Sequence, residues 1–359
     1  MKPLKIRDII ADIPIIQGGM SVGISLSNLA SAVAKEGGIG IIGAAGIGML
    51  EEDFASNFRE ANKRALRKEL KKAKEKTDGI IGVNVMTALS DFEELIKVSC
   101  QSGADIVFMG AGLPLKVPME SFKKYNTKTG VIISSARAAK IVLKYWEKNY
   151  STHPDIFVIE GPLAGGHLGF SKEQLNDENY SLEKILPEVL KVVSEYEKKS
   201  GTKIPVAVAG GIYNGKDIYK FLNAGADAVQ LGTRFVATFE CDADEEFKKA
   251  YINSKKEDIE IIASPVGMPG RVIKNKFTEE VKKGIRRPIK CPWKCLIPCD
   301  FRKVPYCIAL ALTSAGKGQL EDGFVFAGAN AYKVEKIISV KELINSLIEE
   351  YNREKEKQN

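Results

Sequence analysis

Residues 205–235 read PVAVAGGIYNGKDIYKFLNAGADAVQLGTRF, and this stretch decides the fold. Two short apolar runs, Pro205–Ala209 and Ala228–Leu231, flank a segment with helical periodicity that begins near Gly215. Both runs are nearly continuous in apolar residues rather than alternating, which is typical of parallel strands covered on both faces. The order strand, helix, strand therefore predicts a right-handed parallel βαβ unit.

The same alternation of strand and helix continues along the chain from Ile13 onward. Strand candidates are Ile13–Gln17, Ile39–Ile42, Ile80–Val85, Asp105–Phe108, Val131–Ser134, Ile156–Glu160, Pro205–Ala209 and Ala228–Leu231. Helix candidates between them are Leu26–Lys35, Glu51–Lys76, Asp91–Ser102, Ala136–Glu147, Leu182–Lys199 and Gly215–Asn223, with the short Pro118–Tyr125 as the weakest connection. Eight strand–helix units predict a closed (β/α)₈ TIM barrel. A doubly wound open sheet is the competing architecture, but no G-x-G-x-x-G follows the first strand.

The alternation of strand and helix ends beyond Phe235. Residues 240–335 hold weak helical pieces, a cluster of cysteines and the glycine-bearing stretch GFVFAGANAY at 323–332. After them, Ser339 and Glu342 have the spacing of a capping box, which predicts a helix to about Arg353. We expect residues 1–239 and 336–359 to form the barrel, and residues 240–335 to form a C-terminal lobe or lid. The last helix should close against the barrel.

Composition limits the classes of partner. Hydrophobic residues make up 44% and charged residues 28% of the chain, as in ordinary globular proteins. No stretch approaches the ~20 uncharged apolar residues of a membrane span. The N-terminal residues 1–19 carry charges where the apolar core of an export signal would lie. We therefore expect a cytoplasmic protein with no membrane partner.

The net charge of +7 raises the question of nucleic-acid binding. Much of it lies in residues 59–76 (REANKRALRKELKKAKEK), where basic residues alternate with glutamates at helical spacing. Such a run is typical of a solvated helix face, and it lacks the interleaved aromatic residues of single-strand binders. We expect no nucleic-acid partner and a small-molecule substrate, with a homodimer as the candidate assembly.

Glycine-bearing loops follow successive strands at the end where barrels carry their active sites. The candidate binding residues in these loops are Gly18, Gly19, Met20, Gly165, Gly166, Ala209, Gly210, Gly211, Gly232 and Thr233. Loops after strands seven and eight form the usual phosphate site of such barrels, so we predict a phosphate-bearing ligand there. Thr233 can donate its hydroxyl to the phosphate, whereas Arg234 either pairs with the phosphate or forms a structural ion pair.

Two amide side chains interrupt apolar strands. Asn84 lies near the end of the third strand and Gln230 lies inside the eighth. An unpaired buried amide costs on the order of a few kcal/mol, so Gln230 should bond either a ligand or neighbouring backbone. Together with a phosphate site and a glycine-lined barrel mouth, these amides suit flavin mononucleotide (FMN).

His167 stands in the run EGPLAGGHLGF (160–170), and it is one of only two histidines in the chain. The neighbouring glycines let the backbone approach a bulky ligand, and histidine is suited to proton transfer near neutral pH. We predict that His167 is catalytic. The other histidine, His153, precedes the sixth strand and is expected to be a surface residue at the opposite end of the barrel.

As a set, PIIQGGM (14–20), GVNVM (82–86), EGPLAGGHLG (160–169), AVAGGI (207–212) and AVQLGTRF (228–235) resemble the FMN-dependent nitronate monooxygenase family. SPVGMPGR (264–271) also resembles members of this superfamily. The related FMN-dependent enoyl-acyl-carrier-protein reductases share the barrel and a similar GGH motif. The resemblance covers roughly residues 10–240, and it places His167 near the reactive edge of the flavin.

The resemblance implies oxidation of alkyl nitronates by O₂ to carbonyl compounds and nitrite. The alternative is an NAD(P)H-dependent enoyl-acyl-carrier-protein reductase, in which a protonated His167 could polarise the thioester carbonyl. Two other classes are a non-redox phosphate-binding barrel and a flavin-holding scaffold without turnover.

Four cysteines, Cys291, Cys295, Cys299 and Cys307, have the spacing C-x₃-C-x₃-C-x₇-C. Four thiolates can ligate a [4Fe–4S] cluster or a zinc ion, although the spacing matches neither common C-x₂-C form. Free buried thiols and a redox-active pair are the alternatives. Cys100 and Cys241 are isolated in the sequence.

Overall fold

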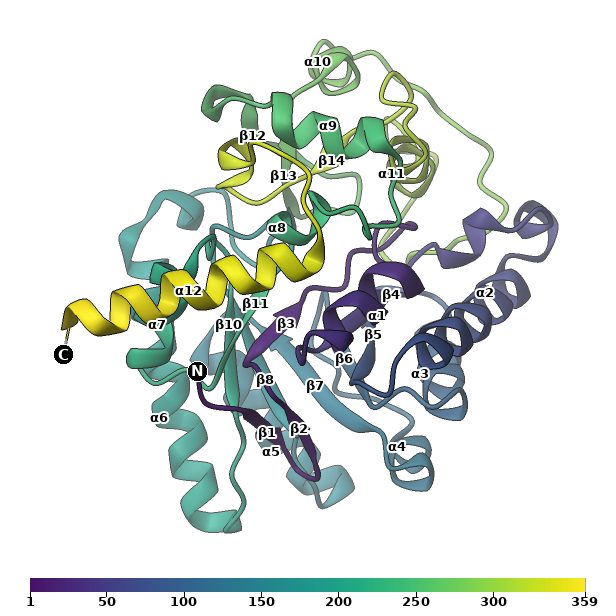
Figure 1. Cartoon of the computed structure of the whole chain (residues 1–359). Coiled ribbons are helices and arrows are strands. Elements are labelled where there is room, and N and C mark those ends of the chain that lie inside the picture. Colours follow the sequence, from purple (N-terminus) through teal and green to yellow (C-terminus); the bar gives the residue numbers. More distant parts are fainter. Residues whose placement is uncertain (359) are drawn as a thin grey trace.

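The computed structural model describes residues 1–358 and shows a parallel barrel as the centre of the fold (Figure 1). Eight strands follow the order β3-β11-β10-β8-β7-β6-β5-β4 around it. Their bounds are β3 Ile15–Gln17, β4 Gly40–Gly43, β5 Ile81–Met86, β6 Ile106–Gly110, β7 Lys128–Ile133, β8 Ile156–Glu160, β10 Val206–Ala209 and β11 Ala228–Leu231. The backbone N–H of Gln17 donates to the backbone carbonyl of Ile39 at 2.9 Å, and this bond joins the two ends of the sheet. The predicted TIM barrel is confirmed, and the open sheet is excluded.

Helices surround the strands in the predicted order. They are α1 Ser27–Lys35, α2 Phe54–Lys76, α3 Phe92–Gln101, α4 Met119–Tyr125, α5 Ala136–Tyr150, α6 Leu182–Ser200, α7 Gly215–Asn223 and the short α8 Thr233–Val236. Single 3₁₀ turns occur at Ile47–Leu50 (η1), Gln174–Asn176 (η2) and Glu178–Tyr180 (η3). In the described chain, no helix is both long and apolar enough to cross a membrane.

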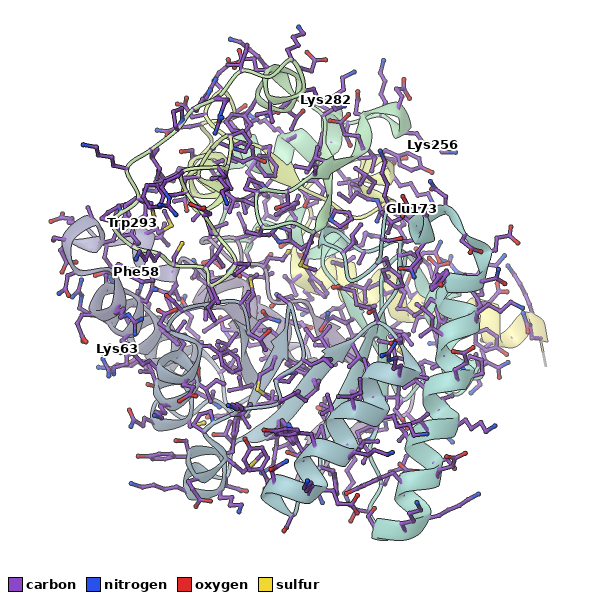
Figure 2. The ribbon with its side chains drawn as sticks, turned by 180° about the vertical axis from the view of Figure 1, so that it is seen from behind. Phe58, Lys63, Glu173, Lys256, Lys282 and Trp293 are labelled. Atoms are coloured by element: carbon purple, nitrogen blue, oxygen red, sulfur yellow. The ribbon has the colours of Figure 1, made fainter. Side chains whose placement is uncertain are left out.

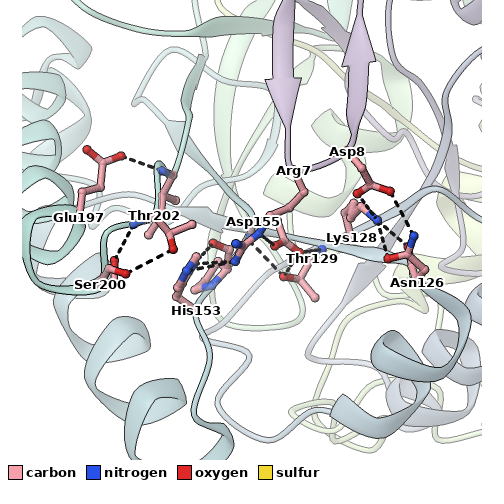
Figure 3. A network of polar contacts seen from close by, with 12 residues as sticks. Arg7, Asp8, Asn126, Lys128, Thr129, His153, Asp155, Glu197, Ser200 and Thr202 are labelled. Carbon is pink, nitrogen blue, oxygen red and sulfur yellow. Dashed lines mark hydrogen bonds and ion pairs between the residues drawn. The ribbon is translucent and has the colours of Figure 1, made fainter.

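A hairpin that the sequence did not predict closes the N-terminal end of the barrel. It consists of β1 Leu4–Ile6 and β2 Ile9–Ala11, and Figure 3 shows the polar contacts that hold it. Arg7 Nε donates to Asp155 Oδ1 at 2.6 Å, and Arg7 Nη2 lies 3.0 Å from His153 Nε2. His153 is buried, so its assignment as a surface residue was wrong. The physical reason is this hairpin, which covers it.

Between α8 and the last helix, the chain builds a lobe over the other end of the barrel (Figure 1). Its elements are α9 Glu245–Asn253, η4 Lys256–Asp258, β12 Ile259–Ala263, β13 Pro269–Ile273, α10 Lys276–Lys282, α11 Ile308–Gly316, β14 Val325–Phe326 and η5 Ala331–Lys333. A small separate cluster of buried side chains, including Phe277, Tyr306 and Phe324, packs beneath these elements. The barrel contributes β9 (Gly166–His167), which pairs antiparallel with β13.

The final helix α12 spans Val340–Gln358 and lies against α7. The Glu342 amide donates to Ser339 Oγ at 3.1 Å, and the Ser339 amide donates to Glu342 Oε2 at 2.8 Å. The Gly215 amide at the start of α7 donates to Glu350 Oε2 at 2.7 Å. The capping box and the packing of the last helix against the barrel are thus as predicted, and the helix extends beyond Arg353.

Candidate active site

A cavity of about 550 Å³ opens at the C-terminal ends of the barrel strands, between the barrel and the lobe. The loops after the parallel strands meet there because all eight strands point the same way. Every residue predicted to bind the cofactor or to be catalytic lines it: Gly18, Gly19, Met20, Asn84, Gly165, Gly166, His167, Ala209, Gly210, Gly211, Gln230, Gly232 and Thr233. Residues from five strand ends, far apart in the sequence, are thereby brought to one cavity.

Gly166 shows why the loop before His167 needs glycine. Its φ is +77°, and no atom lies within 4 Å of where a Cβ would stand. At Gly165, in contrast, a Cβ would lie 2.6 Å from the carbonyl carbon of Ala327 in the lobe. One glycine therefore permits the left-handed turn, and the other permits close contact between barrel and lobe.

His167 is held by the lobe rather than by the barrel. Its Nε2 lies 2.7 Å from Ser264 Oγ, and its ring packs edge-on against Phe326 with centroids 4.9 Å apart. Although part of the residue faces the cavity, burial lowers the pKa of His167 to about 4. The imidazole is therefore neutral at neutral pH. It can accept a proton or donate one N–H, but it is not the protonated group considered for the enoyl reductase.

Arg271 clamps the loop that carries His167. Its buried guanidinium donates to the Pro162 carbonyl at 2.8 Å and also to the Ala164 carbonyl. Burial lowers the pKa of Arg271 to about 10, which leaves the guanidinium charged at neutral pH. Both Ser264 and Arg271 lie in SPVGMPGR, so this segment positions the loop, a role that sequence reasoning did not assign.

Three polar side chains face the cavity without a protein partner. Within residues 1–358, no hydrogen bond involves the side chains of Asn84, Gln230 or Glu160, and all three line the cavity. Gln230 therefore does not bond neighbouring backbone, which was one of the two interactions expected of it; the other was a bond to a ligand. Burial raises the pKa of Glu160 to about 7. Glu160 was missed as a site residue, although its position at a strand end was a usable signal.

The loops after β10 and β11 form one side of the cavity. Gly210 and Gly211 have φ of +97° and +83°, so this turn needs two glycines. Thr233 Oγ1 accepts from the Gly328 amide at 3.2 Å. Arg234 turns away: its guanidinium stacks on the Tyr213 ring at 4.5 Å and donates to the Tyr213 carbonyl at 2.8 Å. Arg234 is thus a structural residue, held by a ring and a carbonyl rather than by an ion pair.

The opposite side, which we call the roof, is apolar and consists of Phe54, Phe58, Trp293 and Leu296. Figure 2 shows Phe58 and Trp293 close together at the edge of the lobe. The Trp293 ring lies 5.3 Å from the Phe54 ring, and its Nε1 donates to the Ala55 carbonyl at 3.2 Å. Sequence reasoning missed the roof because these contacts join segments 238 residues apart.

The four clustered cysteines border a second, smaller cavity beside the first. In this arrangement of residues 1–358, no group of three or more His, Cys, Asp or Glu side chains is placed to hold a metal ion. Cys100 and Cys241 are buried elsewhere and lie apart from both cavities.

Comparison with curated proteins gives relatives that span three quarters or more of the chain. The (3aS,4S,5R,7aS)-5-hydroxy-7a-methyl-1-oxo-octahydro-1H-indene-4-carboxyl-CoA dehydrogenase of Mycobacterium tuberculosis is 25% identical, over 93% of this chain and 92% of its own. A probable nitronate monooxygenase of Staphylococcus saprophyticus is 26% identical, over 75% of this chain and 78% of its own.

Among solved structures, FabK from Thermotoga maritima superposes with a TM-score of 0.74 at 26% identity, covering 97% of this chain and 95% of FabK. The similarity thus includes the lobe as well as the barrel. The family model described as nitronate monooxygenase matches residues 3–350. The chain therefore belongs to the nitronate monooxygenase family of oxidoreductases.

Proposed function

We propose that this protein is an FMN-dependent enzyme that oxidises alkyl nitronates with O₂. The observation that carries the proposal is a neutral His167 at the wall of a cavity formed by glycine loops at the barrel strand ends. In the overall reaction, two nitronates consume one O₂, and each nitronate carbon gains one of its oxygen atoms and becomes a carbonyl carbon. The carbon–nitrogen bond breaks, and the nitrogen leaves as nitrite.

The residues present fit FMN. Asn84 and Gln230 offer unpaired amides to the polar edges of a flat ring system. Gly210, Gly211 and Gly232 line the cavity and have no side chains of their own to shield their backbone N–H groups from a phosphate. When bound, FMN supplies the capacity to accept electrons from the substrate and to pass them to O₂.

His167 binds or deprotonates the substrate in this proposal. A nitronate is an anion, and its two oxygens accept hydrogen bonds from an imidazole N–H. When the substrate arrives as the neutral nitroalkane, the neutral ring accepts the α-proton instead. Ser264, 2.7 Å from Nε2, holds the ring in place, and Nδ1 is left without a protein partner among the described residues.

A second candidate is an NAD(P)H-dependent enoyl-thioester reductase. The apolar roof favours it, because Phe54, Phe58 and Trp293 can cover an acyl chain that a small nitronate does not have. The similarity to an enzyme whose name specifies a carboxyl-CoA substrate points the same way. Against it stands the neutral His167, which does not supply the positive charge considered for polarising a thioester carbonyl.

Two assays on the purified protein test the proposal side by side. With an alkyl nitronate we expect O₂ uptake and release of nitrite, and denaturation should release FMN. With NADH or NADPH and a crotonyl thioester we expect no oxidation of the nicotinamide above background. Thioester-dependent NAD(P)H oxidation without nitrite release would establish the reductase instead, and a protein without flavin would refute both candidates.

A further inference from the structure

The four clustered cysteines converge although the chain that carries them is irregular. Residues 283–307 contain no helix or strand in the described structure. Nevertheless, one small cavity is lined by all four: Cys291, Cys295, Cys299 and Cys307. Four residues spread over positions 291–307 are thereby brought to one site.

The segment that carries the four cysteines is rich in positive charge, which offsets the negative charge of metal-bound thiolates. Residues 282–307 contain eight lysines and arginines and a single acidic residue, Asp300. Cys307 is the N-cap residue of α11, at the helix end where the unpaired backbone N–H groups carry partial positive charge. Both features stabilise negative charge on sulfur, which is the form that ligates metals.

Four thiolates can hold either a zinc ion or a [4Fe–4S] cluster, and the arrangement of the four cysteines favours the cluster. A zinc ion requires all four sulfurs about 2.3 Å from one point, and the present side chains form no such single-ion site. A [4Fe–4S] cluster is larger and takes each thiolate on a different iron atom. We propose that Cys291, Cys295, Cys299 and Cys307 ligate a [4Fe–4S] cluster, a site independent of the proposed nitronate chemistry.

The cluster site shares a wall with the active-site cavity. Cys295, Leu296, Ile308 and Ala309 line both cavities. The Cys295 carbonyl accepts from the Ser90 amide at 3.0 Å, and the Ile297 amide donates to the Ala88 carbonyl at 2.8 Å, which docks this segment on the loop after β5. Four sulfur–iron bonds would fix an otherwise irregular segment, and with it Trp293 in the roof of the active site.

Metal analysis of the intact protein, purified without exposure to air, tests the site directly. We expect about four iron atoms and four acid-labile sulfides per chain, with visible absorption that dithionite bleaches and that remains after FMN is subtracted. The same result should follow reconstitution of apoprotein with iron and sulfide. Iron-free protein after both procedures, stoichiometric zinc, or disulfides among the four cysteines would each overturn the proposal.

Serine variants assign the ligands. Cys299→Ser and Cys307→Ser should each reduce bound iron to less than about a quarter of the wild-type content. Cys100→Ser, which changes an isolated thiol in α3, should retain it. Because a ligand variant can fail to fold, far-UV circular dichroism accompanies each measurement. Full iron content in a folded Cys299→Ser protein, or equal loss in Cys100→Ser, would contradict the assignment.

Discussion

The two sides of the active-site cavity are built in different ways. The barrel side consists of strand-end loops, and its glycines recur after the ends of several strands. The roof consists of side chains from α2 and from the irregular segment 283–307, which meet only through contacts such as Trp293 to Ala55. The difference teaches that the barrel side is formed by a strand–loop pattern repeated along the sequence. The roof, in contrast, depends on packing between distant segments and, as proposed, on a metal cluster.

His167 joins the two sides, and its replacement should have the largest effect. We expect His167→Asn to lower the rate of nitrite release by about 10²–10⁴-fold, because the variant removes the group that accepts or donates the proton. Bound FMN should be retained. The matched control is His153→Asn at the opposite end of the barrel, which should leave the rate nearly unchanged. Equal rates for wild type and His167→Asn would remove His167 from the mechanism.

Trp146 tests how much of the stability resides in the barrel. Its side chain is fully buried, and its Nε1 donates to the Pro114 carbonyl at 2.8 Å. Trp146→Ala should therefore reduce the free energy of unfolding by about 3–5 kcal/mol. Denaturant titration of the holoprotein measures this loss. A loss below about 1 kcal/mol would show that the barrel is not the dominant folding unit.

The sequence predicted all eight barrel strands and many of the residues that line the barrel side, though not Glu160, because buried parallel strands and their glycine loops leave a periodic pattern. It missed the β1–β2 hairpin, whose strands of three residues are too short to show a period. It also missed Ser264 and the roof, since no local pattern records which distant segments will meet. The depressed pKa of His167 likewise depends on burial beneath the lobe.

Ser264 should act as a positioning residue from the lobe. Removing its hydroxyl in Ser264→Ala takes away one neutral hydrogen bond of about 0.5–1.5 kcal/mol, so we expect a 3- to 10-fold loss in kcat/KM. The loss should appear mainly in kcat, and Ser264→Thr should partly restore it. If Ser264→Ala changes KM alone, the serine contacts the substrate and does not orient His167.

The pH dependence separates Glu160 from His167. Because the pKa of Glu160 is about 7, its carboxyl ionises as the pH rises through neutrality and then repels an anionic nitronate. We expect kcat/KM to fall several-fold from pH 6 to pH 8, and Glu160→Gln to abolish this fall. Because its pKa is about 4, His167 stays neutral in this range. The plot of kcat/KM against pH should therefore show no change in slope due to His167 near 6.5, the ordinary pKa of histidine. An acidic limb near 6.5 that disappears in His167→Asn would refute the depressed pKa.

Trp293, the second tryptophan of the chain, should give the smallest effect and the sharpest contrast with Trp146. It is half-buried and is held by one ring contact and one hydrogen bond. Trp293→Ala should therefore cost less than about 1 kcal/mol and lower Tm by no more than about 4 °C. The KM for a short nitronate should change by about two- to threefold, because the barrel side of the cavity is untouched. If Trp293→Ala destabilises the protein as much as Trp146→Ala does, the roof is part of the folding core. The division between a barrel side set by local repetition and a roof set by long-range contacts would then fail.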